Sequence, residues 1–239
     1  MKSNNKDSIS LNKFISNTGR CSRREADMWI EMGRIKINGK VANKGNRVNP
    51  GDSISIDGKK VKNVSKEKGI YLAVHKAPGI TCTTDQTDPD NIIDYVNYPK
   101  RIFPIGRLDK ASSGLILMTN DGDIVNKILR SENNHEKEYI VTVHKALSMS
   151  FLQGMRSGVP ILGKRTKRCV VQSVGKQTFR IILTEGMNRQ IRRMCEHFGY
   201  RVLSLKRIRV MNIELANLKV NHWRILSNEE KKELFESLK

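Results

Sequence analysis

Residues 10–57 show two patterns typical of helices, followed by patterns typical of strands. Apolar residues recur at helical spacing from Leu11, between a capping Ser10 and a terminating Gly19, and they predict a first helix. A second helix is predicted to begin after Ser22, because Glu25 three residues later completes the spacing of a capping box. Each helix is short and would bury a single apolar stripe.

From residue 34 onward, apolar and polar residues alternate with the period of two that is typical of strands. Residues 34–41 alternate around an Asn-Gly pair, which is the strongest short-range signal for a β-hairpin, and a further alternating strand follows at residues 53–57. Residues 58–68 are rich in lysine and have no apolar periodicity, so they are predicted to form a linker. Residues 1–9 are polar and are predicted to be disordered.

The remainder, residues 69–239, mixes strand-like with helix-like segments and is predicted to form one larger domain. The predicted strands lie at residues 70–75, 114–118, 139–143, 168–174, 179–183 and 207–210. The predicted helices lie at residues 121–130, 148–156 and 188–198, with a last one from Ser227. This mixed order predicts an α+β fold on a mixed, mostly antiparallel sheet.

The net charge indicates which kinds of molecule the protein binds. Lys and Arg number 44 against 24 Asp and Glu, which gives a formal charge of +20 and an isoelectric point near 10.0. A field of this sign attracts polyanions such as RNA, DNA or an anionic membrane surface. A membrane is the weaker candidate, because no apolar run approaches the roughly 20 residues that a spanning helix needs.

Other classes of site are disfavoured by what the sequence lacks. The four cysteines are scattered singly, so neither a disulfide framework nor a zinc site is expected. A phosphate-binding GxxxxGK[ST] motif and a dinucleotide fingerprint are both missing, so no cofactor and no metal are expected. The opening residues contain no apolar segment of a secretory leader, and the reducing cytoplasm is the expected compartment.

Two short helices followed by a small hairpin sheet resemble the S4 RNA-binding domain. The resemblance covers residues 10–57 and is carried by the segments LNKFIS, CSRREADMWIEMGRIKINGK and SISID. It implies contacts to RNA phosphates, which position an RNA without reading its sequence. The candidate RNA-binding residues are Lys13, Arg20, Arg23 and Arg24. Taken singly, each of them would be an ordinary solvated charge on a helix face.

A second segment carries the candidate chemistry. Arg107 and Asp109 lie on a short predicted loop between Gly106 and the buried strand that starts at Gly114. By spacing alone, Asp109 would be a structural turn-former, since aspartate in loops usually is.

The residues GRLDKASSGL, however, match the GRLDxxSxGL motif of RNA pseudouridine synthases. The blocks NDGDIVNKILR, HEKEYIVTV and EGMNRQIRRMCEHFGY follow in the same order as in that family. With the S4-like domain in front, nearly the whole chain resembles the branch of the small-subunit synthase A, and within it the F-type synthases of the large ribosomal subunit.

The resemblance implies three catalytic residues. Asp109 would be the essential carboxylate, and Tyr139 would be the tyrosine that stacks on the uracil, although a core aromatic on a strand is the other interpretation. Arg192 would pair with Asp109 and orient it. Helical spacing leaves three arginines available for this pairing, at positions 189, 192 and 193, and the motif selects Arg192.

The resemblance also implies substrate-binding residues. A uridine in folded RNA must leave its stack to be reached, and Arg107 would fill the space that it vacates. Ile191 and Met194 would form the floor of the uracil pocket, or else pack in the core.

The implied function is the conversion of a specific uridine to pseudouridine in structured ribosomal RNA, with 23S rRNA as the expected substrate. That reaction breaks the N1–C1′ bond, turns the uracil and rejoins it through C5; whether it passes through attack at C1′, attack at C6 or a glycal stays open. A tRNA or another rRNA stem-loop is the alternative substrate, and a binding-only ribosome factor of S4 type is the alternative function. A monomer is expected, because no heptad or exposed apolar run indicates a partner surface.

Overall fold

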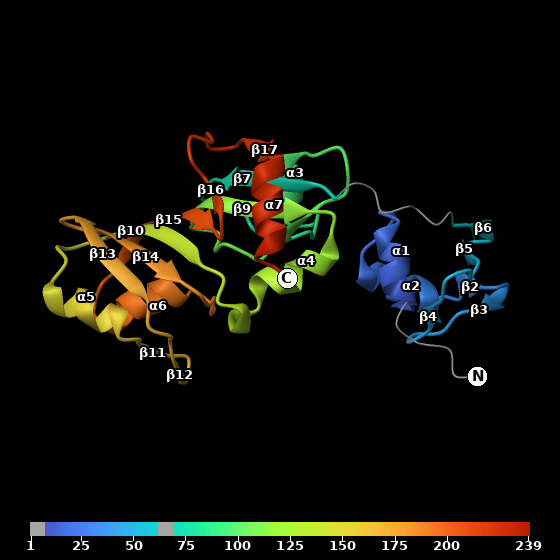
Figure 1. The fold of residues 1–239 in the computed structure, drawn as a ribbon, viewed down its shortest axis with the longest axis horizontal. Coiled ribbons are helices and arrows are strands. Elements are labelled where there is room, and N and C mark those ends of the chain that lie inside the picture. Colours follow the sequence, from blue (N-terminus) through green and yellow to red (C-terminus); the bar gives the residue numbers. More distant parts are fainter. Residues whose placement is uncertain (1–7, 62–68) are drawn as a thin grey trace. The chain divides into compact units, whose positions relative to one another are not determined.

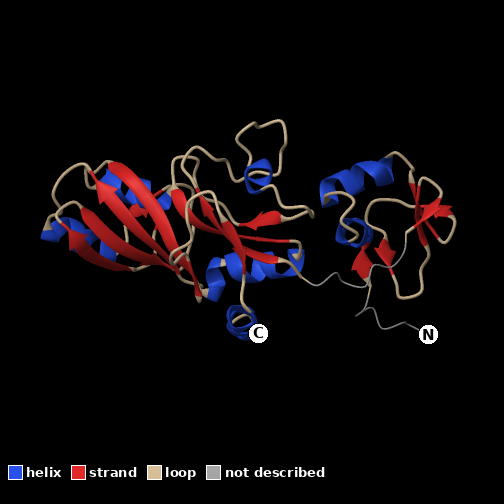
Figure 2. Ribbon diagram, turned by 90° about the horizontal axis from the view of Figure 1, so that it is seen from above, coloured by secondary structure: helices blue, strands red, loops and turns tan. Residues whose placement is uncertain are grey.

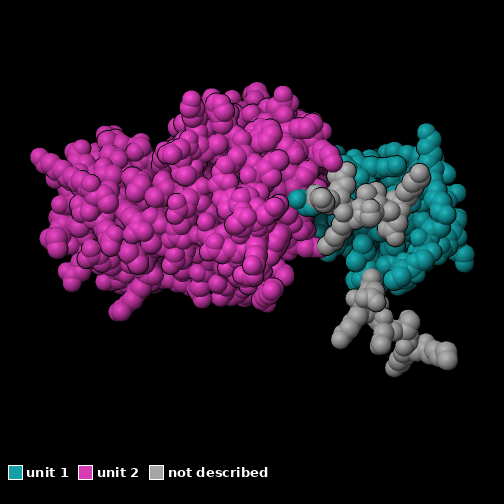
Figure 3. Space-filling view, turned by 45° about the horizontal axis from the view of Figure 1, so that its top comes forward, with its two compact units in different colours: residues 1–69 teal, residues 70–239 magenta. Residues whose placement is uncertain are grey.

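A computed structural model of the protein describes residues 8–61 and 69–239, and the chain divides between Gly69 and Ile70 into two compact units (Figure 3). Each unit has its own hydrophobic core, as separately folding domains do. Two predictions, the disorder of residues 1–7 and the linker over residues 62–68, lie outside the described residues.

The smaller unit packs two helices against a four-stranded antiparallel sheet of order β3-β2-β5-β6 (Figure 1). Its helices are α1 (Leu11–Asn17) and α2 (Arg23–Glu31). The strands of the sheet are β2 (Ile35–Ile37), β3 (Lys40–Val41), β5 (Ile54–Ile56) and β6 (Lys59–Lys60). A separate two-stranded ladder joins β1 (Ile9–Ser10) to β4 (Arg47–Val48).

Local signals in this unit act largely as predicted. The Ser22 hydroxyl accepts the Glu25 amide at 3.1 Å and the Glu25 carboxylate accepts the Ser22 amide at 2.6 Å, which confirms the capping box. Ser10 takes the N-cap position of α1, but its side chain makes no capping hydrogen bond. The hairpin is confirmed, because Asn38 and Gly39 have φ values of 50° and 82°, as a type I′ turn requires.

Two predicted boundaries in this unit are wrong. Disorder was expected to reach residue 9, yet Ser8 is buried and accepts a hydrogen bond from Arg47 Nε at 2.8 Å, and Ile9 lies in β1. The linker was expected to begin at residue 58, yet β6 pairs with β5 and Val61 is buried. Both elements are two residues long, too short to produce a period in the sequence.

The larger unit is built on a mixed sheet of order β13-β14-β10-β15-β9-β7-β17, with β16 added to β15 and β8 added to β9. Within residues 69–239 every pairing of these strands is antiparallel except that of β15 with β9, which confirms the predicted fold class. The strands are β7 (Tyr71–Lys76), β8 (Phe103–Ile105), β9 (Ser113–Thr119), β10 (Lys137–Val143), β13 (Val170–Gly175), β14 (Thr178–Leu183), β15 (Val202–Val210), β16 (Ile213–Glu214) and β17 (Trp223–Ile225).

The helices of this unit lie on both faces of the sheet (Figure 2). They are α3 (Ile92–Val96), α4 (Gly122–Leu129), α5 (Met149–Arg156), α6 (Gln190–His197) and α7 (Asn228–Glu236), with a 3₁₀ turn η1 (Ser131–Asn133) and a small hairpin of β11 (Pro160–Ile161) and β12 (Lys164–Arg165). The sequence did not predict α3 or β17, which are five and three residues long. The sequence also predicted that β15 begins at residue 207, whereas this strand begins at Val202. The first half of the strand does not alternate regularly, and its Leu203 is 56% exposed.

The central strands bury both of their faces, in two separate clusters. On β9, Ile116 and Met118 belong to the buried cluster that includes residues of α3, α5 and α6, whereas Leu115 and Leu117 belong to the cluster that includes residues of α4 and α7. The uninterrupted apolar run of this strand is therefore the pattern of a strand covered on both sides.

One close approach joins the two halves of the sheet. Gly114, at the start of β9, pairs in parallel with Arg207 of β15 and has a φ of 109°. A Cβ atom at position 114 would lie 2.2 Å from the Arg207 carbonyl oxygen. Only glycine satisfies both the backbone conformation and the contact.

Replacement of Gly114 with Ala is expected to lower the free energy of unfolding of the larger unit by roughly 2–5 kcal/mol, because it adds backbone strain to a steric clash. Urea unfolding or calorimetry of the full chain measures the change. Gly175→Ala is the control, since its Cβ would meet only Thr178 Cβ at 3.7 Å. Equal effects of the two substitutions would contradict this account of the strand junction.

Candidate active site

A cavity of about 860 Å³ opens in the larger unit where the β8–β9 loop, strand β10 and the segment before α6 meet. Cavities of this size are typical of small-molecule and nucleotide sites. The predicted residues that line it are Arg107, Asp109, Tyr139 and Ile191. No group of three or more side chains among the described residues has the arrangement of a metal site.

Asp109 lies on a loop that is fixed at both ends. The loop leaves β8 through Gly106, which has a φ of 77°, and it enters β9 at Ser113. A turn in which the Ser112 amide donates to the Asp109 carbonyl oxygen at 2.9 Å closes it. The Asp109 side chain is 32% exposed and faces the cavity, so the loop presents a carboxylate that water and a ligand can both reach.

Arg192 is the arginine that the structure places beside this carboxylate. Its Nε lies 3.7 Å from Asp109 Oδ2, and its Nη2 donates to Ala111 O at 3.3 Å and to Ser112 Oγ at 3.2 Å. The Nε is buried and finds no hydrogen-bond partner within residues 8–61 and 69–239. Arg192 therefore holds the loop through its terminal nitrogen and faces the carboxylate with a donor that is still unused.

The choice among the three arginines follows from how α6 packs. Ile191, Met194 and Cys195 are buried as the periodicity predicts, and Arg192 is buried beside them at 9% exposure. Arg193 instead donates to Asn188, and Arg189 takes the N-cap position in a left-handed conformation at the cavity.

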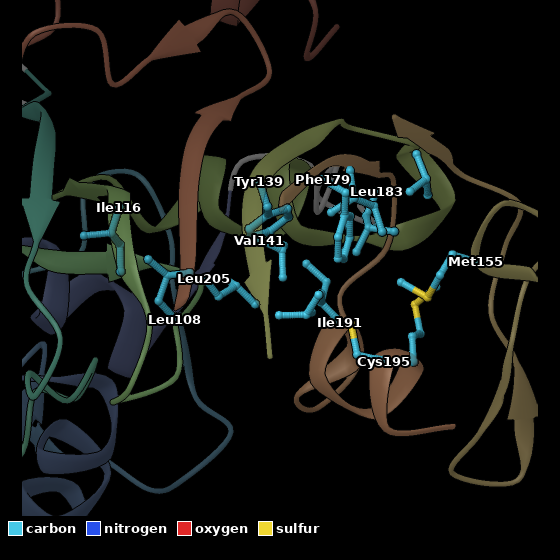
Figure 4. Packing of buried hydrophobic residues seen from close by; sticks show 14 of the residues in the cluster. Leu108, Ile116, Tyr139, Val141, Met155, Phe179, Leu183, Ile191, Cys195 and Leu205 are labelled. Carbon is cyan, nitrogen blue, oxygen red and sulfur yellow. The ribbon is translucent and has the colours of Figure 1, made fainter. Parts of the chain in front are cut away.

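Tyr139 belongs both to the cavity wall and to the core. Figure 4 shows the side chains of Tyr139 and Val141 on β10 lying over Ile191 and Cys195 of α6. The Tyr139 side chain is 8% exposed and lines the cavity together with Ile191. Met194 is fully buried and does not line the cavity, so for this residue the structure favours core packing.

Arg107 is exposed at the cavity, two residues before Asp109. The four cations predicted to bind RNA belong to the smaller unit. Arg20, Arg23 and Arg24 are exposed, the last two in the first turn of α2, and Lys13 on α1 is half-buried.

Sequence reasoning missed three buried cations around the Asp109 loop. Lys76 is fully buried, and its Nζ donates to the carbonyl oxygens of Ala77 at 2.8 Å, Ile80 at 2.9 Å and Lys110 at 3.3 Å. Burial lowers the pKa of Lys76, and the nearby Asp109 opposes that shift. A lysine at the end of the apolar strand β7, just before a Pro-Gly turn, was the signal available in the sequence.

The other two, Lys137 and Arg207, line the cavity itself. Lys137 is 7% exposed and its Nζ donates to His135 O at 3.2 Å, and Arg207 is 4% exposed and its Nε donates to Leu115 O at 2.7 Å. Burial, and then the charge of Arg207, lower the pKa of Lys137 to about 8. No pattern in the sequence marked either residue, because the periodicity of a strand does not show that a cation in it is buried.

The arrangement suits one kind of chemistry. The Asp109 carboxylate lines the cavity and pairs with Arg192, which is buried and does not line it, and the cavity wall offers an aromatic ring and aliphatic side chains. Such a site can hold a flat base against the ring while the carboxylate stabilises positive charge that develops on an adjacent carbon atom.

Comparisons with known proteins agree with this geometry. The family model described as RNA pseudouridylate synthase matches residues 70–197, and that of the S4 domain matches residues 10–54. The dual-specificity RNA pseudouridine synthase RluF of Escherichia coli K12 is 52% identical over 228 residues, which cover 95% of this chain and 79% of that protein. The ribosomal large subunit pseudouridine synthase B of Bacillus subtilis is 35% identical over 94% of each chain.

A solved structure gives the same result. A crystal structure of a pseudouridylate synthase superposes with a TM-score of 0.69 at 25% identity, and the match covers 95% of this chain and 99% of that one. The chain therefore belongs to the RNA pseudouridylate synthase family, in the branch that carries an S4 domain, and it is an RNA pseudouridine synthase.

Proposed function

We propose that the protein converts a specific uridine of 23S rRNA to pseudouridine and that Asp109 is the catalytic carboxylate. The observation that carries the catalytic assignment is the pair of Asp109 with the buried Arg192, at a cavity that Tyr139 lines. A carboxylate in this position faces the ribose of a nucleotide whose base lies against Tyr139.

The chemistry can be assigned to these groups. When the N1–C1′ bond breaks, its electron pair leaves with the uracil, and C1′ becomes electron-deficient. Asp109 stabilises or traps that carbon, as carboxylates do in retaining glycosidases. The uracil then turns against Tyr139, C5 bonds to C1′, and the proton on C5 is removed while N1 gains one; we assign that transfer to the Tyr139 phenol.

The substrate assignment rests on relatives and on charge. The B. subtilis relative is named for the large ribosomal subunit, and the chain carries a net charge of +20 together with an S4 domain. A tRNA or another rRNA stem-loop is the second candidate, because the E. coli relative is named as having dual specificity.

We propose a cytoplasmic monomer. Within the described residues no helix is long and apolar enough to cross a membrane.

The S4 unit is proposed to hold the RNA by its backbone. Arg23 and Arg24 are exposed in the first turn of α2, where the helix dipole disfavours positive charge and favours an anion. Bound phosphates would relieve that unfavourable arrangement.

Replacement of Asp109 with Asn should lower tritium release from [5-³H]uridine-labelled 23S rRNA by roughly a thousandfold or more, because it keeps size and removes the carboxylate. RNA binding should persist in the same preparation. Glu236→Gln, an exposed carboxylate on α7, is the charge-matched control. Full activity of the Asn variant would exclude Asp109 as the catalytic residue.

The rRNA assignment is tested separately in a strain that lacks the gene. Pseudouridine mapping should reveal that one 23S site is no longer modified, and the gene carrying Asp109→Asn should fail to restore it. If every 23S site persists and a tRNA site disappears, the second candidate substrate replaces the first.

For the S4 unit, Arg23→Ala with Arg24→Ala should weaken RNA binding uniformly across sequences. The slope of log K against log salt should become shallower by about 1 for each phosphate that the variant no longer neutralises. Lys59→Ala with Lys60→Ala changes the net charge equally in the same unit, on exposed positions of β6. Equal effects of the two double variants would mean that net charge alone matters, and not a specific binding surface.

A further inference from the structure

Besides Arg192, three buried cations surround the Asp109 loop, and they differ in how many of their donors are used. An ammonium group has three N–H donors and a guanidinium has five. Lys76 donates to three carbonyl oxygens, so its capacity is filled within the protein. Lys137 donates to one carbonyl oxygen, and Arg207 likewise donates to one, through Nε, among the described residues.

Lys137 and Arg207 also have no counter-ion within residues 8–61 and 69–239, where neither forms a salt bridge. They lie on the paired strands β10 and β15, where Lys137 is opposite Val210 and Arg207 is opposite Tyr139, and both line the same cavity. The charge of Arg207 accordingly contributes to the lowered pKa of Lys137. Burying two like charges beside each other is costly unless an anion neutralises them.

The carboxylates that line the same cavity are engaged elsewhere. Glu185 accepts hydrogen bonds from Gln190 and from the Lys167 amide, and Asp85 accepts from Thr87. The Asp88 side chain accepts from the Asp90 amide, and Asp109 faces Arg192. None of these carboxylates forms a salt bridge with Lys137 or Arg207, so a bound ligand is the remaining source of an anion that would pair with them directly.

We propose that Lys137 and Arg207 together form an oxyanion subsite in the cavity, which binds an anionic oxygen of the target nucleotide. Both residues line the cavity, both are more than nine-tenths buried, and the terminal nitrogens of Arg207 donate to no described residue. A guanidinium with free terminal nitrogens and an ammonium beside it offer several charge-assisted hydrogen bonds to one anionic group.

Two kinds of oxygen atom in a uridine nucleotide have this chemistry. One is a phosphate oxygen, which is anionic before the reaction begins. The other is the O2 or O4 of uracil, which becomes anionic only when the electron pair of the N1–C1′ bond leaves with the base. This inference rests on the proposed function for the identity of the nucleotide, but not for the existence of an anion site.

Lys137→Met tests the subsite, because methionine has a similar shape and no charge. We expect the product of single-turnover rate and RNA affinity to fall by about tenfold to a hundredfold, the effect of losing one hydrogen bond to a charged group. We also expect the melting temperature to stay equal or rise, because an uncompensated buried charge has been removed. Lys137→Arg keeps the charge and should restore most of the activity.

The control is Lys176→Met, which removes the same charge at an exposed turn between β13 and β14. The measurements are the dissociation constant of the RNA and, at saturating RNA, the single-turnover rate of tritium release. A larger dissociation constant with an unchanged single-turnover rate identifies the phosphate as the bound group. An unchanged dissociation constant with a slower rate identifies the uracil anion.

If Lys137→Met and Lys176→Met changed the dissociation constant and the single-turnover rate equally, the proposal would be overturned. A lowered melting temperature with an activity decrease that Lys137→Arg does not restore would also overturn it, because the lysine would then be structural. Absence of tritium release by the unmodified protein on rRNA would instead contradict the proposed substrate. The subsite would then still be tested by RNA affinity.

Discussion

Two residue pairs, Lys206 with Ser113 and Arg207 with Gly114, make the parallel contact between β15 and β9. This short contact joins the half of the sheet that contains β10, the strand of Tyr139, to β9, the strand that follows the Asp109 loop. Because it lies at the first residues of β9, it fixes the end of that loop relative to β10 and α6. The glycine at position 114 is required here, since a side chain would overlap the Arg207 backbone. The distances between the carboxylate, the arginine and the tyrosine all depend on this junction.

Buried cations hold the backbone of the Asp109 loop, and an exposed ion pair of Lys110 with Asp90 at 2.7 Å adds to them. Lys76 donates to Lys110 O, Arg192 to Ala111 O and Arg207 to Leu115 O, so three buried side chains bind the backbone of the turn and of the strand that follows it. A carbonyl oxygen orients a cation without cancelling its charge. The net positive charge thus stays in the low-dielectric surroundings of Asp109, where it acts more strongly than in water. A substrate that carries negative charge completes this arrangement.

The sequence predicted what depends on periodicity, capping and motif, and missed what depends on contacts between distant strands. Strands β10 and β14 and helix α6 were found because their apolar residues repeat, and the Ser22 capping box because its spacing is local. Arg192 was selected by the family motif, because helical spacing alone did not distinguish it from Arg189 and Arg193. Lys137 and Arg207 were not predicted, because their burial results from pairing between β10, β14 and β15, which are distant in sequence.

The cations of the two units respond differently to salt, and this separates their roles. Exposed charges such as Arg23 and Arg24 act over a Debye length of about 8 Å at physiological ionic strength and are screened. Lys137 and Arg207 are buried, so salt screens them little, and they act only on a group that enters the cavity. The proposed capture of the RNA backbone by the exposed charges is therefore expected to weaken with ionic strength, whereas the proposed binding of an anion by Lys137 and Arg207 is expected to persist. Under that proposal, salt releases nonspecific RNA more readily than a uridine that has entered the cavity.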